Sequence, residues 1–528
     1  MSSTVDLPRR RLLHALGAGV PIVATPTIAG SGVLSLIQSN QAIRIDVFRL
    51  GVASGEPHPS GFTLWCRLLA DEAAQALPPE VAVQWEVAAD QGFREIIQRG
   101  EHFAISAWDH SVHIDVTGLE ASRPYWYRFS ALGQQSRVGR TRTAPIISAL
   151  EPLHFVTASC QRWDHGHYAA WHHISRESPD LVLFLGDYIY EYGAVAGRIR
   201  AHEGGLVSTL AQYRARYAQY KSDPALQSAH ACAPWMVIWD DHEVDNDYAN
   251  LQGERLQPDF ASQRAAAYQA YWENMPLPNT MRPGFERTGG ALTLYRRREW
   301  GRLARLHFLD DRQYRDVQVC PRPGKGGSAV VKRAACPTID DDGRSLLGRD
   351  QEKWLAEGWD LNRPWNLVAQ QTLMARQAWT DPSAVDQGSY WTDGWDGYPA
   401  ARARLLDGIV QRKVAGVVVL GGDVHAHYVA DIKASFDDLH SAIIATEFCG
   451  TSISSFGLNN ATLQKASVFN PHLKYARSDQ RGYMSFTLTE RALEARVMAL
   501  DDVNAGDSAV QVVARYAVDP REPGANPT

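Results

Sequence analysis

Between residues 47 and 145, hydrophobic and polar residues alternate along several short segments, a pattern typical of strands with one buried face. The segments are 62–68, 81–87, 113–116 and 125–129, and turn-forming residues separate them. About a hundred residues with short, regularly spaced strands are typical of an immunoglobulin- or fibronectin-like β-sandwich. We therefore predict a small all-β domain at residues 47–147, which packs against the rest of the chain or shapes the edge of a substrate site.

After residue 152 the pattern changes to short, continuous apolar runs that alternate with helical segments. The runs are 154–159, 181–187, 235–239, 303–309, 366–369 and 417–420. Strands that are apolar on both faces are typical of a parallel sheet covered by helices, so this region is predicted to be α/β. Period-two strands return between residues 483 and 500 and are expected to close one edge of a sheet. We assign residues 152–515 to one large domain.

Polar side chains gather where four of the apolar runs end. Cys160 follows the first run, and Asp187 and Tyr190 follow the second. The densest group, Asp240–Asp247, follows the third, and Asp423–His427 follows the last. Parallel strands bring their carboxyl ends to one edge of a sheet, where open α/β sheets bind ligands. We expect these side chains to meet there, and their oxygen-rich composition suits hard cations or a mixed metal site.

Each of these groups also has a purely structural interpretation. The 240–247 group could begin an acidic helix, Cys160 could be a small buried hydrophobe, and Asp187 could cap a helix. Tyr190 could be a packing aromatic, and His427 is expected to be solvated or to lie behind the ligands. A metal site is the better interpretation because four such groups follow four separate strands.

The composition limits the classes of partner. With 528 residues the chain is too long for one ordinary domain. Its net charge of −6 provides no basic excess for nucleic acid, which also disfavours a secreted nuclease. Outside the N-terminal segment no apolar run is long enough to span a bilayer, so no stable membrane span is expected.

Residues 1–40 are predicted to be a targeting segment. Three arginines at positions 9–11 precede two leucines and a run of small and apolar residues between positions 15 and 36. This order resembles a twin-arginine signal, which exports folded proteins in bacteria. An uncleaved anchor helix or a basic tail is the alternative, but prolines and glycines between positions 21 and 32 interrupt the run. The interpretation predicts recognition by the twin-arginine export machinery and a periplasmic or secreted location.

The chain has 6 cysteines and no C-x-x-C pair. Cys320 and Cys336 lie on either side of a loop rich in proline, glycine and lysine. Because an exported protein can oxidise such a pair, we expect a disulfide between them.

Several motifs carry a resemblance to a known family. Gly186-Asp187, Asp241-His242-Glu243 and Gly422-Asp423-Val424-His425 resemble the motifs of calcineurin-like metallophosphatases. Segments 159–160, 309–315 and 395–399 make the chain more similar to the PhoD-type alkaline phosphatase/phosphodiesterase branch. The resemblance covers nearly the whole chain after residue 47. It implies a four-layer α/β/β/α metallophosphatase sandwich, preceded by the small all-β domain.

The resemblance implies that Cys160, Asp187, Tyr190 and His425 hold a first cation, with Asp187 bridging to a second. Cys160 stands where most members of the superfamily have a D-x-H motif, so a plain zinc or manganese pair is not expected. A thiolate together with a phenolate favours Fe³⁺, because both are good donors to a strongly Lewis-acidic ion.

The second cation would be held by Asp241 and Asp423, with Asn246 and Asp240 as further oxygen ligands. Many relatives have an asparagine and a histidine at the first two positions. Replacing these by carboxylates makes the site harder and favours Ca²⁺, although other divalent metals are compatible with the motifs.

The resemblance also implies how an ester would be cleaved. The metals would neutralise the phosphate oxygens and generate a hydroxide nucleophile near neutral pH. His242, beside the metal ligand Asp241, would protonate the leaving alkoxide, and Glu243 would fix the tautomer of its ring.

Arg312 is the candidate for binding the phosphate. Its planar guanidinium can donate two parallel hydrogen bonds to phosphate oxygens. A salt bridge to Asp310 or Asp316 is an equally good interpretation of this arginine.

The sequence therefore predicts an exported metal-dependent hydrolase that cleaves phosphate monoesters, diesters or both. The main alternative is a phospholipase D-like phosphodiesterase that acts on lipid head groups. A cell-surface binding protein with an inactive α/β domain is a further alternative, but the intact set Cys160, Asp187, Asp241, His242 and His425 argues against it. The expected substrate is a small-molecule or lipid phosphoester, and the chain is expected to act as a monomer.

Overall fold

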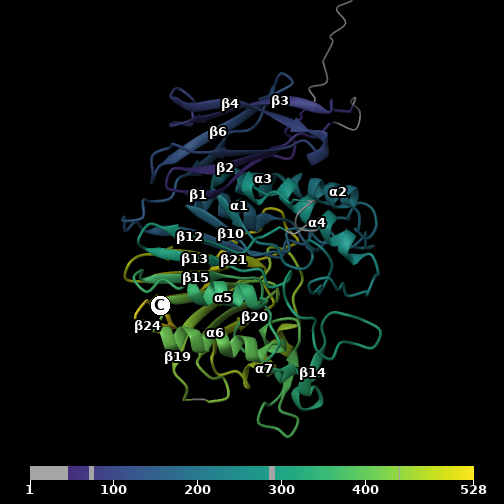
Figure 1. The fold of residues 1–528 in the computed structure, drawn as a ribbon, viewed down its shortest axis with the longest axis vertical. Coiled ribbons are helices and arrows are strands. Elements are labelled where there is room, and N and C mark those ends of the chain that lie inside the picture. Colours follow the sequence, from purple (N-terminus) through teal and green to yellow (C-terminus); the bar gives the residue numbers. More distant parts are fainter. Residues whose placement is uncertain (1–45, 71–75, 285–291, 439) are drawn as a thin grey trace, which may run out of the picture. The chain divides into compact units, whose positions relative to one another are not determined.

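The computed structural model describes residues 46–70, 76–284, 292–438 and 440–528. They all lie in one compact unit, Ile45–Thr528. The predicted targeting segment, residues 1–40, lies outside the described residues. Two large mixed sheets form the body of the unit (Figure 1).

The larger sheet has ten strands in the order β24-β23-β22-β21-β9-β10-β11-β1-β2-β5. Strands β9, β10, β11 and β1 run parallel, and the flanking strands pair antiparallel. The predicted runs at 154–159, 181–187 and 235–239 form β9, β10 and β11. Strand β9 begins and ends one residue before its run, and β10 and β11 are shorter than theirs. The bounds are β1 (Val52–His58), β2 (Gly61–Arg67), β5 (Ser111–Val116), β9 (Leu153–Ala158), β10 (Leu181–Phe184), β11 (Trp235–Val237), β21 (Gly482–Leu488), β22 (Leu493–Leu500), β23 (Val510–Asp519) and β24 (Glu522–Pro527).

The second sheet has seven strands in the order β12-β13-β15-β17-β19-β18-β20. Its centre, β13-β15-β17-β19, is parallel, as the continuous apolar runs predicted for β13, β15 and β17. The bounds are β12 (Arg296–Trp300), β13 (Ala304–Phe308), β15 (Trp365–Ala369), β17 (Val417–Gly421), β18 (His427–Lys433), β19 (Ile443–Cys449) and β20 (Leu473–Arg477).

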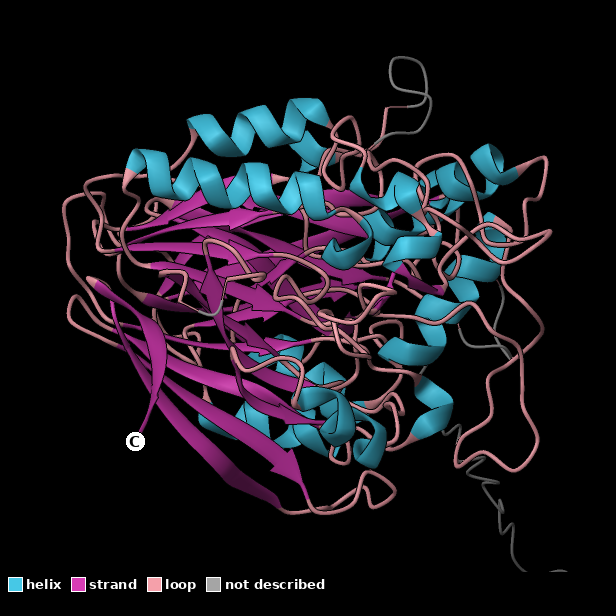
Figure 2. Cartoon of the chain, turned by 90° about the horizontal axis from the view of Figure 1, so that it is seen from below, coloured by secondary structure: helices cyan, strands magenta, loops and turns pink. Residues whose placement is uncertain are grey.

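The two sheets pack face to face, and helices cover their outer faces. Phe486 of β21 stacks on Phe155 of the same sheet and meets Phe448 of the second sheet at a centroid distance of 5.4 Å. Helices α1–α4 share a core with the outer face of the first sheet, and α5–α7 share one with the second. Figure 2 shows strands in the middle with helices above and below them. Successive residues on one strand therefore serve two cores, which explains the continuous apolar runs.

The helices begin at conventional signals. Thr209 and Gln212 form a capping box before α2, and the Asp223 side chain accepts backbone hydrogen bonds at the start of α3, where Pro224 is the first residue. The α-helices are α1 (Ala169–Glu177), α2 (Leu210–Lys221), α3 (Pro224–Cys232), α4 (Phe260–Asn274), α5 (Arg349–Glu357), α6 (Pro399–Arg412) and α7 (Asn460–Ser467). Short 3₁₀ helices are η1 (Ser106–Trp108), η2 (Trp163–His165), η3 (Asn279–Met281), η4 (Arg333–Ala335), η5 (Pro337–Asp340) and η6 (Trp395–Gly397).

The N-terminal strands form two packed layers, and one of them continues into the large sheet. The outer layer consists of β3 (Glu80–Ala88), β4 (Ile96–Ile105), β6 (Pro124–Ala131), β7 (Gln134–Gln135) and β8 (Gly139–Arg142). The inner layer, β1-β2-β5, joins the ten-stranded sheet because β1 pairs in parallel with β11. Strand periodicity did not predict this continuity, since the pairing partner lies far along the chain.

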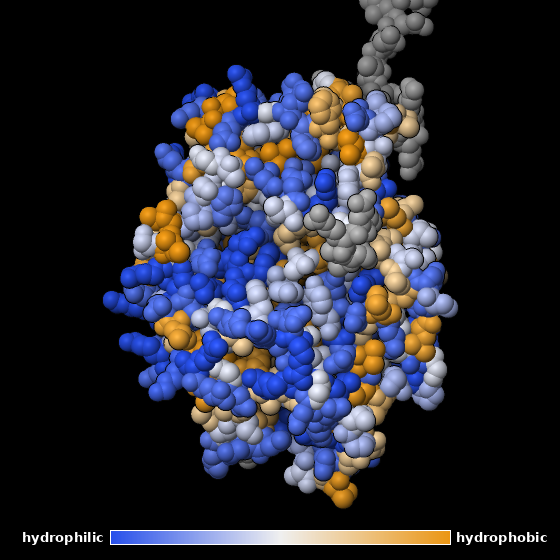
Figure 3. Space-filling view, in the orientation of Figure 1, coloured by the Kyte–Doolittle hydropathy of each residue, from blue (hydrophilic) through white to orange (hydrophobic). Residues whose placement is uncertain are grey.

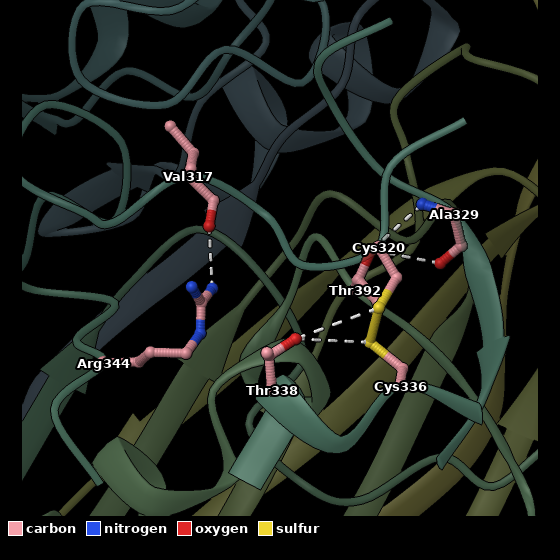
Figure 4. The surroundings of a disulfide bond; sticks show 7 residues. All are labelled: Val317, Cys320, Ala329, Cys336, Thr338, Arg344 and Thr392. Carbon is pink, nitrogen blue, oxygen red and sulfur yellow. Dashed lines mark hydrogen bonds between the residues drawn. A yellow bond between two sulfur atoms is a disulfide. The ribbon is translucent and has the colours of Figure 1, made fainter. Parts of the chain in front are cut away.

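A two-stranded ribbon stands apart from the large sheets. Strand β14 (Val330–Lys332) pairs antiparallel with β16 (Ser389–Trp391). The predicted disulfide is confirmed: Cys320 and Cys336 are bonded, with their Cα atoms 6.2 Å apart. Figure 4 shows this bond beside Thr338 and close to the hydrogen bonds between Ala329 and Thr392, which hold the first strand against the second.

On the face drawn in Figure 3, hydrophobic residues lie singly or in small groups among hydrophilic ones. Within the described ranges, no helix combines the length and the apolar character that a membrane crossing requires. Single exposed apolar residues are ordinary on a folded surface.

Candidate metal centre and active site

The side chains that follow β9, β10, β11 and β17 meet, as the strand-end pattern predicted. Four of the predicted ligands also share an unusual backbone: their φ angles lie between 51° and 64°, and they are Cys160, Asp187, Asp423 and His425. Residues other than glycine rarely adopt this left-handed region. Such strain persists where the surrounding structure enforces it, and it is concentrated at functional sites.

Two glycines of the predicted motifs permit the close approach of these strand ends. A Cβ atom on Gly186 would lie 2.4 Å from the Cβ of Asp240, and one on Gly422 would lie 2.4 Å from the Oγ of Ser159. Neither distance is tolerable for a real side chain, so the glycines let the chain segments of the site touch.

The first group of side chains contains Cys160, Asp187, Tyr190 and His425. Potential ligand atoms of Cys160, Asp187 and His425 all lie within 4.8 Å of one another. The Tyr190 hydroxyl donates to Oδ2 of Asp187 at 2.6 Å and lies 3.1 Å from Nε2 of His425. The sequence-based grouping is therefore realised in space, with a sulfur, a phenol, a carboxylate and an imidazole around one point.

The second group consists of carboxylates, and Asp241 is the member that it has in common with its neighbours. Asp240, Asp241 and Asp423 form one set of mutually close oxygens, and Asp241 with Asp247 and Asp393 forms another. Asp241 also lies close to Asp187 and His242. Asp187 and Asp241 thus connect the sulfur-containing group to the carboxylate groups.

The burial, pKa values and hydrogen-bond partners of these groups indicate whether they suit metal ions. Burial, the largest cause, raises the pKa of Asp240 and of Asp423 well above the usual range, and the pKa of Asp247 rises to about 7. One oxygen each of Asp240 and Asp423, Oδ2, is buried without a hydrogen-bond partner among the described residues. Burial also raises the pKa of the Cys160 thiol and of the Tyr190 phenol. Burial therefore favours the neutral forms of these groups, whereas a bound cation would stabilise their anionic forms, and the two carboxylate oxygens without partners suit such a cation.

Arg312 lies among the carboxylates and is almost completely buried. Its Nε donates to Asp240 at 2.5 Å, its Nη1 donates to Asp393 at 2.5 Å, and its Nη2 lies 3.7 Å from both Asp241 and Asp423. The salt bridge considered with Asp310 or Asp316 is therefore wrong. Only the Arg312 backbone amide contacts Asp310. Arg312 is not among the described residues that line the cavity, and its guanidinium faces carboxylates.

His242 is paired with a carboxylate, but not with the one expected. Its Nδ1 lies 2.8 Å from Oε2 of Glu191, and its ring packs on that of Tyr190 at a centroid distance of 4.1 Å. The expectation that Glu243 fixes this ring is wrong, because Glu243 accepts the backbone amides of Asp187, Tyr188 and Asp240. Burial lowers the pKa of His242, but Glu191 and the neighbouring aspartates outweigh burial and hold it well above its usual value.

Asn246 lies at the same site, with its side chain held by protein groups. Its Oδ1 accepts a hydrogen bond from the Tyr192 hydroxyl at 2.9 Å, and its backbone amide donates to Glu191 at 3.1 Å. Asn246 lines the cavity beside Asp241 and His242, so its place next to the carboxylate group agrees with the sequence-based grouping.

A cavity of about 360 Å³ opens beside these groups. Its polar part includes both histidines and the aspartates at positions 187, 241, 247 and 423, and its other part is apolar and aromatic. The lining residues that belong to the predicted site are Asp187, Asp241, His242, Asn246, Asp423 and His425.

Known proteins are similar to this chain in sequence and in fold. The PhoD-like phosphatase family matches residues 155–497, and the N-terminal domain of PhoD-like phosphatases matches residues 35–145. The chain belongs to the PhoD-like phosphatase family. It is 40% identical over 484 residues to alkaline phosphatase D of Bacillus subtilis (strain 168), an alignment that covers 89% of this chain and 80% of that protein. This PhoD-like phosphatase is thus a phosphatase or phosphodiesterase, a hydrolase of phosphoesters.

Solved structures agree with this membership. The structure of PhoD matches with a TM-score of 0.85 and 38% identity, over 91% of this chain and 92% of that one. Purple acid phosphatase PPD1 from yellow lupin (Lupinus luteus) seeds matches with a TM-score of 0.54 and 12% identity, over 89% and 74% of the two chains, and shows similarity of fold alone. The fold is accordingly α/β and metallophosphatase-like, with mixed sheets.

Some side chains of this PhoD-like phosphatase site were not assigned a role from the sequence. Glu191 and Asp247 lie inside motifs that had been singled out, so spacing alone could have suggested them. Asp393 and Ser455 follow no predicted strand end. Asp393 contacts Arg312, and Ser455 Oγ lies 2.8 Å from both the Tyr190 hydroxyl and the Cys160 carbonyl. No signal in the sequence pointed to these two contacts, which depend on loops.

Proposed function

We propose that the chain hydrolyses phosphate monoesters, diesters or both, using two kinds of metal ion and His242 as the proton donor. One observation carries the proposal. The Cys160–Asp187–His425 group and the carboxylate groups are joined through Asp187 and Asp241 and share one cavity with His242. Family membership alone supports phosphoester hydrolysis. The arrangement of these side chains supports the further proposal of which residues bind the metals and which one donates the proton.

The two donor sets differ in chemistry, and this difference supports a different metal for each. Cys160, Asp187, Tyr190 and His425 suit Fe³⁺, because a thiolate and a phenolate stabilise a strongly Lewis-acidic ion. Asp241 and Asp423, with Asn246 and Asp240 close by, suit Ca²⁺, which prefers oxygen ligands, and other divalent metals remain compatible. When bound, such cations supply positive charge for the phosphate oxygens and lower the pKa of an attacking water.

His242 is assigned the proton transfer because of its surroundings. Glu191 engages Nδ1, which leaves Nε2 as the nitrogen that can donate into the cavity. The carboxylates around the ring support its positive charge, so a proton is available for a leaving alkoxide. Asp241 contributes both as a ligand and as one of these carboxylates.

Arg312 acts through the carboxylates in this proposal. Its guanidinium sits between Asp240 and Asp393 and faces Asp241 and Asp423. A fixed positive charge among so many acidic groups reduces their mutual repulsion and orients them toward the cations. Arg312 lies behind the ligands, so in this proposal the cations and His242 bind the phosphate in its place.

We extend the proposal to architecture and location. Two sheets packed face to face with helices outside support the four-layer α/β/β/α order. The two N-terminal layers support a small β-sandwich at residues 47–147 before a catalytic region at 152–515.

The disulfide between Cys320 and Cys336 supports export to the periplasm or beyond by the twin-arginine route, because such bonds persist in oxidising compartments. The chain would act as a monomer on a small-molecule or lipid phosphoester, without nucleic acid.

Elemental analysis combined with activity assays tests the proposal. The protein purified from its export compartment should contain iron and calcium and should hydrolyse p-nitrophenyl phosphate, bis(p-nitrophenyl) phosphate or both. Cys160→Ala should remove the iron and spare most of the calcium, whereas Asp423→Asn should do the reverse. Metal-replete protein that cleaves neither ester, or a C160A variant that keeps its iron, would contradict the assignment.

A further inference from the structure

We propose that the apolar part of the catalytic cavity binds one uncharged, apolar group of the phosphoester, of about the size of a phenyl ring. The inference rests on the proposed function and names the class of substrate for the same site. A cavity of about 360 Å³ is large enough for a small organic ligand and exceeds what a phosphoryl group alone needs.

The apolar wall is assembled from three parts of the fold. Two of its residues lie on the ribbon, two follow β15, and two lie in or just before α7: Val330, Trp391, Leu373, Trp379, Leu458 and Leu463. Val330 is 60% exposed and Leu458 is 44% exposed. Apolar side chains that face water at a cavity gain free energy when a ligand covers them.

Charge restricts what can occupy this part of the cavity. None of the described residues that line it is a lysine or an arginine, so a second phosphate or a carboxylate would find no partner. Asp396, which also lines the cavity, is already paired with Arg402 at 2.7 Å. A cationic group would therefore compete with an existing ion pair, and an uncharged group fits best.

The ribbon fixes the position of the apolar wall relative to the carboxylates. Val330 and Trp391 are directly opposite each other on β14 and β16. Nε1 of Trp391 donates to Oγ of Ser328 at 3.0 Å, and the Ser328 hydroxyl donates to Asp247 at 2.5 Å. An apolar group on this wall is thereby placed at a defined distance from a phosphoryl group at the carboxylates.

Non-hydrolysable phosphonates test the inference, because they have the phosphoryl end and differ in the organic group. The full-length, metal-loaded enzyme is assayed with bis(p-nitrophenyl) phosphate or p-nitrophenyl phosphate, and inhibition constants are measured for methylphosphonate and phenylphosphonate. We expect phenylphosphonate to bind about tenfold more tightly than methylphosphonate. Equal inhibition constants would overturn the subsite, whereas failure of both compounds and of substrate cleavage would instead overturn the proposed function.

Exposed residues provide variants that should fold normally. Val330→Ser and Leu458→Ser should each reduce the phenyl-to-methyl preference by about threefold, because each removes apolar contact area. Val385→Ser is the matched control, since Val385 is 98% exposed and does not line the cavity. An unchanged preference in both V330S and L458S would place the phenyl group elsewhere and overturn the inference.

An isosteric pair separates an uncharged group from a cation. The compounds 4,4-dimethylpentylphosphonate and 3-(trimethylammonio)propylphosphonate have nearly the same shape and differ by one positive charge. We expect the uncharged compound to bind at least as tightly as the cation. Tighter binding of the cation by about tenfold would show that the aromatic wall recognises a quaternary ammonium group, and it would overturn the uncharged class.

Discussion

Replacing His242 by alanine should slow cleavage of alkyl phosphoesters strongly while leaving the metal content intact. Glu191 holds Nδ1 of the ring at 2.8 Å, and the ring packs on Tyr190 at 4.1 Å, so its orientation is fixed from two sides. The remaining nitrogen can serve the leaving group in the cavity. The variant therefore removes a positioned proton donor. The contacts among Cys160, Asp187, Tyr190 and His425 do not involve the His242 side chain, so the first metal should stay bound.

The expected magnitude is set by the contribution of general acid catalysis. A positioned donor accelerates a reaction by roughly 10²–10⁴-fold, which corresponds to about 3–5 kcal/mol of transition-state stabilisation. Glu191→Gln should cost less, because the amide can still accept the Nδ1 hydrogen bond. A hydrogen bond to a charged group contributes about 1–1.5 kcal/mol more than a neutral one, so E191Q should slow the reaction about tenfold.

The assay compares esters with poor and good leaving groups at fixed metal content. Alkyl phosphates should show the full loss in H242A, whereas nitrophenyl esters, whose leaving group needs little protonation, should show a much smaller one. His173→Ala is the control, since His173 lies on α1 and does not line the cavity. Equal losses for both ester types would refute proton donation by His242, and loss of metal from H242A would identify the residue as a ligand.

Three further predictions concern other parts of the molecule. Tyr190→Phe should abolish the visible absorption of the iron-loaded protein, because the colour of such a site arises from phenolate-to-iron charge transfer; an unchanged band would exclude Tyr190 as a ligand. Replacing Cys320 and Cys336 by serine should lower the free energy of unfolding, measured in denaturant titrations, by about 3 kcal/mol. It should also weaken the preference for phenylphosphonate over methylphosphonate. Equal stability of the variant would show that the loop is held without the disulfide bond. Burial raises the pKa of Glu177, but hydrogen bonds from His154 and other neighbours outweigh it and lower the pKa to about 2 from 4.5. The contribution of Glu177 to the free energy of unfolding is therefore complete above pH 4.5 and is lost as the pH falls toward 2. Glu177→Gln should remove up to about 2 kcal/mol of this pH dependence. An unfolding free energy with the same pH profile in the variant would refute the assignment.

Local information was sufficient for much of the fold and for most of the candidate site. The continuous apolar runs identified β9, β10, β11, β13, β15 and β17, because each strand contributes successive residues to two cores. Residues placed directly after parallel strands are brought together by the sheet itself, so Cys160, Asp187, Asp241 and Asp423 could be grouped without knowledge of the tertiary structure. The Cys320–Cys336 pairing was predictable for a similar reason, since the two cysteines close one short loop.

Tertiary packing decided which neighbours each of these side chains has. The partner of His242 is Glu191, which comes after a different strand, and not the adjacent Glu243, whose carboxylate turns to backbone amides. Arg312 pairs with Asp240, which follows β11, and with Asp393, which follows β16, because folding buries it where an unpaired charge would be costly. The parallel pairing of β1 with β11 likewise joins strands far apart in the chain. Sequence patterns specify which face of an element is buried and which residues come directly after a strand, whereas contacts between loops and between distant strands depend on the packing of the whole chain.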